Sequence, residues 1–123
     1  MAGRLFVVAT PIGNLGDLSP RALDTLRAVQ VIACEDTRHT RVLLDKFGVA
    51  TATVSLPAFA EGQRAQAIID RLVGGDDVAL VTDAGTPAIS DPGEKLVVEA
   101  VAAGVTVIPV PGPAAIIAAL SAG

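Results

Sequence analysis

Residues 78–110 read VALVTDAGTPAISDPGEKLVVEAVAAGVTVIPV and contain one complete repeating unit of the fold. The apolar run 78–81 has the length of a buried strand. Asp91-Pro92 then supplies a capping residue and a proline at the first helical position. Gly104 ends that helix before a second apolar run, 105–110. A strand, a helix and a second strand in this order form a right-handed crossover between parallel strands. The stretch therefore predicts an α/β protein.

The same order recurs along the rest of the chain. Three more runs predict strands, at 5–9, 29–34 and 51–56. Four more helices are predicted, beginning at Ser19-Pro20, at Asp36 or Thr37, at Gln63 and at Ala114. Hydrophobic residues make up 51% of the 123 residues and aromatic residues only 2%, which is typical of a parallel sheet buried on both faces. We predict one α/β domain with a mostly parallel five-stranded sheet flanked by helices.

The spacing of apolar residues predicts which helix positions face the sheet. In the second helix we expect Val42, Leu43 and Phe47 to face inward. In the helix after Asp91-Pro92 we expect an inward row of Leu96, Val97, Ala100 and Val101.

Composition and length exclude several classes of protein. The single cysteine, Cys34, rules out an internal disulfide and a cysteine-based zinc site, and its apolar neighbours predict a buried thiol. We expect no bound metal. No apolar run reaches the roughly 18 residues that span a bilayer, and no secretory signal begins the chain, so we expect a cytoplasmic protein without a membrane segment. The formal net charge of −4 means that any nucleic acid must be held by a local patch, a second copy or a further domain.

Four stretches are candidates for the chemistry because ligands of open parallel sheets bind beyond the carboxyl ends of the strands. They are 10–18, 35–41, 82–92 and 109–113. Two X-Pro units restrain the backbone of the third stretch, which suits a small ligand. Asp91 is expected to cap a helix, so Asp83 is the better site candidate there. The Gly13-x-x-Gly16 spacing is a weak match to a dinucleotide fingerprint.

The second stretch has two carboxylates and two arginines within seven residues, and its sequence leaves two interpretations open. In one, Asp36 caps a helix while Arg38 and Arg41 are solvated on its surface. In the other, Glu35 or Asp36 orients a hydroxyl or accepts its proton, and Arg38 or Arg41 holds a phosphate. His39 is expected to be a surface histidine.

Taken together, the blocks VATPIGNL (8–15), IACEDTRHT (32–40), DAGTPAISDPG (83–93) and PVPGPA (109–114) resemble the signature blocks of one family. It is the ribosomal RNA small subunit methyltransferase I family of the tetrapyrrole methylase superfamily. The resemblance covers essentially the whole chain. It implies a fold of two α/β domains with the cofactor in the cleft between them, so that residues 1–123 would be the N-terminal domain and the second domain would be absent from this chain.

The resemblance also implies a function. Members of the family use S-adenosylmethionine to 2′-O-methylate a cytidine of small-subunit (16S) ribosomal RNA within the 30S subunit, and they are usually homodimers. The matching positions imply cofactor contacts at Thr10, Pro11, Asp83, Ala84, Gly85, Thr86, Ile89, Ser90, Ala114 and Ala115. Glu35 or Asp36 would be the catalytic carboxylate, and Arg38 and Arg41 would bind the substrate RNA.

Three alternatives remain at this point. A tetrapyrrole or other small-molecule methylase would use the same cofactor on a different acceptor. A nucleotide- or NAD-binding module is the second, because Asp36 lies 23 positions after Gly13, close to the position of a ribose-binding acid. The third is a dimerisation domain without activity of its own.

Overall fold

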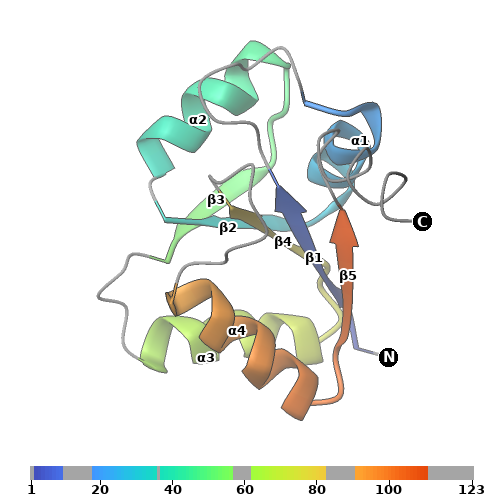
Figure 1. Ribbon diagram of the computed structural model, residues 1–123, viewed down its shortest axis with the longest axis vertical. Helices are drawn as coiled ribbons and strands as arrows, with labels where there is room; N and C mark the ends of the chain where they lie inside the picture. Colours follow the sequence, from blue (N-terminus) through green and yellow to red (C-terminus); the bar gives the residue numbers. More distant parts are fainter. Residues whose placement is uncertain (1, 10–17, 36, 57–61, 83–90, 111–123) are drawn as a thin grey trace, which may run out of the picture.

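The computed structural model describes residues 2–9, 18–35, 37–56, 62–82 and 91–110. Within these ranges strands and helices alternate along the chain (Figure 1). The strands are β1 (Arg4–Ala9), β2 (Val31–Cys34), β3 (Ala52–Ser55), β4 (Val78–Thr82) and β5 (Thr106–Val110), and the helices are α1 (Pro20–Ala28), α2 (Thr37–Lys46), α3 (Gly62–Val73) and α4 (Asp91–Ala102). The predicted α/β class and the order of elements are confirmed, with ends that differ by one or two residues. The last of the predicted helices, 114–120, lies outside the residues that the structure describes.

The strands form one sheet in the order β3-β2-β4-β1-β5, and every pair in it is parallel. All five carboxyl ends therefore lie at the same edge, which we call the carboxyl edge. The register brings the ends to nearly the same level. Ala9 pairs with Thr82, Val8 pairs with Val110, and Ala33 pairs with Leu80.

The helices cover both faces of the sheet. From β1 to β3 the chain steps along the sheet in one direction, and from β3 to β5 it steps in the other. Since parallel crossovers are right-handed, α1 and α2 must lie on one face and α3 and α4 on the opposite face. Figure 1 shows these two helix layers on either side of the strands.

Each helix layer closes a core of its own against the sheet. Side chains of one strand alternate between the two cores, as in β2, where Ile32 and Cys34 face α1 and α2 while Val31 and Ala33 face α3 and α4. A sheet buried in this way selects aliphatic residues at nearly every strand position. The Cys34 thiol is buried, and its Sγ donates a hydrogen bond of 3.7 Å to the carbonyl oxygen of Val54, which confirms the predicted buried thiol.

Two residues that were predicted to face the sheet are exposed to solvent instead, so these two predictions were wrong. Val42 is 64% exposed and Val101 is 61% exposed. In α2 the inward row is Thr40, Leu43 and Leu44, and the half-buried Phe47 continues it directly after the helix, with the intervals of three and four that a helix face requires. Val42 lies outside this inward row of α2. The prediction was based on its apolar character and was therefore wrong.

The start of α1 fixes the chain where it enters the first helix layer. The Ser19 hydroxyl accepts a hydrogen bond of 3.1 Å from the Ala22 N–H, and Pro20 occupies the first turn. This arrangement confirms the predicted cap-and-proline start. Among the described residues, no helix has the length and hydropathy needed to cross a bilayer.

Candidate active site at the carboxyl edge

The carboxyl edge brings together the starts of all four candidate stretches. Stretches 10–18, 35–41, 82–92 and 109–113 begin at the ends of β1, β2, β4 and β5, which are consecutive in the sheet order β2-β4-β1-β5. Neighbouring strands are about 4.8 Å apart, so four consecutive strand ends lie within about 15 Å of one another. The expected convergence of these stretches at one edge therefore holds for the strand ends from which they start.

Most of the predicted site residues lie outside the described ranges. They are Thr10, Pro11, Asp36, Asp83, Ala84, Gly85, Thr86, Ile89, Ser90, Ala114 and Ala115. Their contacts with a cofactor or a substrate stay predictions. The described residues of the predicted site are Glu35, Arg38 and Arg41.

The topology gives β4 a special place at this edge. β4 lies between β2 and β1, whose chains leave the sheet toward the layer of α1 and α2. The chain that leaves β4 enters α4, in the opposite layer. Ligands of open α/β sheets bind where neighbouring connections diverge to opposite faces in this way. On both sides of β4, the neighbouring strand therefore leads to the opposite helix layer. Asp83 directly follows the end of β4.

Glu35 is the described carboxylate at the carboxyl edge. It directly follows β2, and its side chain is exposed. The pairing of Ala33 with Leu80, continued by two residues, sets Glu35 level with Thr82 at the end of β4. A charged carboxylate at this position is accessible to a substrate that approaches the edge.

The two arginines of α2 are in different environments. Arg38, in the first turn, is exposed. Arg41 is about one-third exposed, and its guanidinium donates to the carbonyl oxygens of Val49 and Thr51, the latter at 2.9 Å. Its Nε also donates to the Asp45 carboxylate at 3.0 Å. These hydrogen bonds fasten α2 to the segment that leads into β3, so Arg41 has a structural task in addition to any contact with RNA.

An open pocket of about 450 Å³ lies between α2 and β3, the strand at one end of the sheet order. It is lined by Thr37, Arg38, Arg41, Val42, Asp45 and Thr53. Although five of these six residues are polar or charged, most of the surface that they expose to the pocket is apolar. The sequence prediction missed it, although positions 37, 38, 41, 42 and 45 have the spacing of one helix face and could have revealed it.

Among the described residues, no group of three or more His, Cys, Asp or Glu side chains is arranged to hold a metal ion.

We expect Arg41→Gln to lower the free energy of unfolding of the full-length protein by about 2 kcal/mol, because hydrogen bonds to charged groups are worth about 1.5–3 kcal/mol each and glutamine cannot bridge three acceptors. Arg38→Gln is the matched control, with an expected change within about 0.5 kcal/mol at an exposed position. Urea unfolding measures both. An equal loss in the two variants would contradict the structural task of Arg41.

The fold places this chain among open α/β proteins, a class in which ligands bind beyond the carboxyl ends of the parallel strands. Solved structures of methyltransferases share this architecture. Cobalt precorrin-4 methyltransferase, a cobalamin biosynthetic enzyme, matches with a TM-score of 0.73 at 21% identity, covering 97% of this chain and 49% of that chain. Uroporphyrin-III C-methyltransferase of Thermus thermophilus matches with a TM-score of 0.67 at 19% identity, over 89% of this chain and 45% of that chain.

Residues 4–123 match the family model of the tetrapyrrole (corrin/porphyrin) methylases, and the chain belongs to this family. Among curated proteins it is 60% identical over 119 residues to the ribosomal RNA small subunit methyltransferase I of Xylella fastidiosa, covering 97% of this chain and 44% of the relative. It is 56% identical over 118 residues to the protein of that name from Vibrio cholerae, covering 96% and 41%. The chain thus spans less than half the length of these relatives. The resemblance inferred from the four sequence blocks is confirmed.

Proposed function

We propose that the protein containing this chain is an S-adenosylmethionine-dependent methyltransferase that 2′-O-methylates a cytidine of 16S ribosomal RNA in the small subunit. The observation that supports it most is the 60% identity, over nearly the whole chain, to a relative that bears the name of a small-subunit ribosomal RNA methyltransferase. In this proposal the chain is the N-terminal α/β domain of a two-domain enzyme. The enzyme acts in the cytoplasm as a homodimer.

The cofactor proposal fits the arrangement of the strand ends. Residues proposed to hold S-adenosylmethionine follow β1, β4 and β5, namely Thr10 and Pro11, Asp83 to Thr86 with Ile89 and Ser90, and Ala114 and Ala115. The ends of these three strands are adjacent and level, since Ala9 pairs with Thr82 and Val8 with Val110. One ligand could therefore touch all three stretches. The solved uroporphyrin-III C-methyltransferase of Thermus thermophilus is a complex with S-adenosylhomocysteine, the demethylated form of this cofactor.

The reaction would require two tasks from this chain. The bound cofactor supplies an electrophilic methyl group, and the protein's main contribution is to align the ribose hydroxyl with it. That hydroxyl is a poor nucleophile, so a carboxylate that accepts its proton assists. Glu35, exposed at the carboxyl edge, or Asp36, its neighbour, is proposed for this task. Arg38 and Arg41 are proposed to hold RNA phosphates nearby, with Arg38 the more exposed of the two.

The test is methylation of purified 30S subunits by the full-length protein with a methyl-labelled cofactor. We expect label in 16S RNA at one cytidine, whose methylated ribose makes the adjoining phosphodiester bond resistant to alkali. The 50S subunit is the matched control. Label in an added tetrapyrrole precursor, with none in 16S RNA, would favour the small-molecule methylase instead.

A further inference from the structure

The two helix layers differ in charge. Residues 18–56, which include α1 and α2, contain five Lys and Arg against four Asp and Glu. Residues 62–110, which include α3 and α4, contain three against seven. Within the helices themselves, α1 and α2 contain five Lys and Arg against two Asp and Glu, whereas α3 and α4 contain three against four, so the excess of cations lies on the α1 and α2 side. This asymmetry matters for a polyanion, since nucleic acid binding depends on local clusters of cations.

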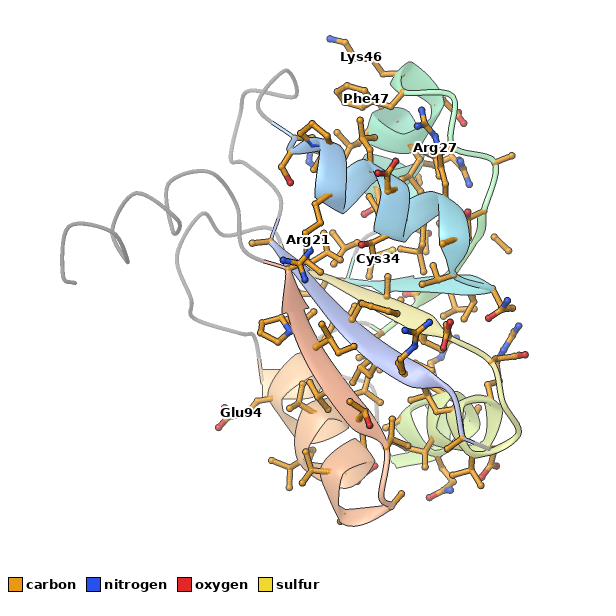
Figure 2. The ribbon with its side chains drawn as sticks, turned by 90° about the vertical axis from the view of Figure 1, so that its right-hand side faces the viewer. Arg21, Arg27, Cys34, Lys46, Phe47 and Glu94 are labelled. Carbon is orange, nitrogen blue, oxygen red and sulfur yellow. The ribbon has the colours of Figure 1, made fainter. Side chains whose placement is uncertain are left out.

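The cations of the positive layer lie on its outer surface. Arg21 and Arg27 on α1, and Arg38 and Lys46 on α2, are all exposed. Figure 2 shows Arg27 and Lys46 on the α1 and α2 side of the sheet, with Glu94 of α4 on the other side. Arg27 also donates a hydrogen bond of 2.9 Å to the carbonyl oxygen of Phe47, which links the end of α1 to the end of α2. These exposed cations define what we call the basic surface of α1 and α2, which also carries the exposed acids Asp24 and Asp45.

The helix dipole does not favour two of these cations at their positions. Arg21 and Arg38 occupy the second positions of α1 and α2, and neither helix has an acidic residue in its first turn. The helix dipole favours acidic side chains at such positions by about 0.3–1 kcal/mol and disfavours basic ones. Both helices start from the carboxyl edge, because each follows a strand end there. The two arginines therefore continue the basic surface up to the edge where Glu35 lies.

We propose that the substrate RNA binds along the outer surface of α1 and α2 and reaches the carboxyl edge from there. Its phosphate backbone would contact Arg21, Arg27, Arg38 and Lys46. The proposal rests on the proposed function and adds a docking surface to it. It also resolves the difficulty that the acidic net charge poses for RNA binding. The acidic layer of α3 and α4 faces away from the RNA.

The test compares two double variants of the full-length protein that remove the same amount of charge. Arg21→Gln with Lys46→Gln changes the basic surface, and Arg71→Gln with Lys95→Gln changes exposed cations of the opposite layer. Arg71 pairs with Asp76 at 3.1 Å, but exposed pairs of this kind add little stability. Filter binding to 16S ribosomal RNA at several salt concentrations gives the affinity and its salt dependence.

For the first double variant we expect a Kd about tenfold higher at 0.15 M salt, and a slope of log K against log salt that is smaller by about 1.4–1.8, because two phosphate contacts are lost. The second double variant should bind within about twofold of the unchanged protein. Equal weakening in both variants, or none in the first, would overturn the docking surface.

The same proteins separate this inference from the proposed function. If both double variants bind RNA equally well and still transfer methyl groups to 16S RNA, the docking surface is refuted and the proposed function is not. RNA binding that depends on the α1 and α2 surface, without methyl transfer by the unchanged protein, would refute the proposed function alone.

Discussion

Glu35→Gln or Asp36→Asn should lower the rate of methyl transfer to the 30S subunit by about 10²- to 10⁴-fold in the full-length protein, which is the usual contribution of a general base. We expect this loss in one of the two variants, because one carboxylate is enough to accept the hydroxyl proton. If Asp36 is instead the cap of α2, Asp36→Asn should change stability by well under about 1 kcal/mol, since asparagine caps as well as aspartate.

Glu94→Gln is the matched control for this experiment. Glu94 is also exposed, but it lies on α4, in the opposite layer (Figure 2). Single-turnover rates with saturating cofactor would measure the chemical step, and Kd values for RNA would show that binding is retained. Unchanged rates in both Glu35→Gln and Asp36→Asn would remove these two residues from the mechanism.

Cofactor affinity should depend on the stretch that follows β4. We expect Asp83→Ala to weaken binding of S-adenosylhomocysteine by roughly 10- to 100-fold, which corresponds to the loss of a hydrogen bond with a charged partner. Thr86→Trp should weaken it further, because a bulky ring would fill space next to the backbone that the ligand needs. Isothermal titration calorimetry of the full-length protein measures both affinities.

Asp76→Ala provides the comparison for Asp83→Ala, since Asp76 lies just before β4, at the other end of the same strand. Its carboxylate accepts a hydrogen bond from Arg71 on an exposed surface. The affinity for cofactor should stay the same in this variant. If Asp83→Ala and Thr86→Trp also bind normally, the cofactor lies elsewhere than beside the end of β4.

The strands and the carboxyl edge of the sheet could be predicted from the sequence because each depends on a short run of neighbouring residues. The run 78–81 is apolar because it is buried on both faces of the sheet, and the residues after it are small, constrained or charged. Glu35 was found by its place after a strand. The strand order could not be predicted in the same way, because the pairing of β1 with β4 and β5 joins residues that are distant in sequence.

The structural task of Arg41 also could not be predicted from the sequence. Two of its partners are the backbone carbonyl groups of Val49 and Thr51, and a carbonyl group is the same whatever the residue. Only the turn of the chain after α2 brings these oxygens within reach of the guanidinium. Val42 shows the opposite failure, because an apolar side chain was assigned to the core although it borders an open pocket beside β3.

The pairing of β1 with two late strands also has a consequence for how the protein emerges from the ribosome. β1 is the first strand of the described chain, yet its partners in the described sheet are β4 and β5, the last two strands. β2 and β3 can pair as soon as residue 55 is free, whereas β1 has no strand to join until residues 78–82 have been translated. Long-range pairings of this kind form slowly and leave apolar segments exposed to aggregation. The nascent chain must therefore keep the apolar strand β1 unpaired until residues 78–82 have emerged.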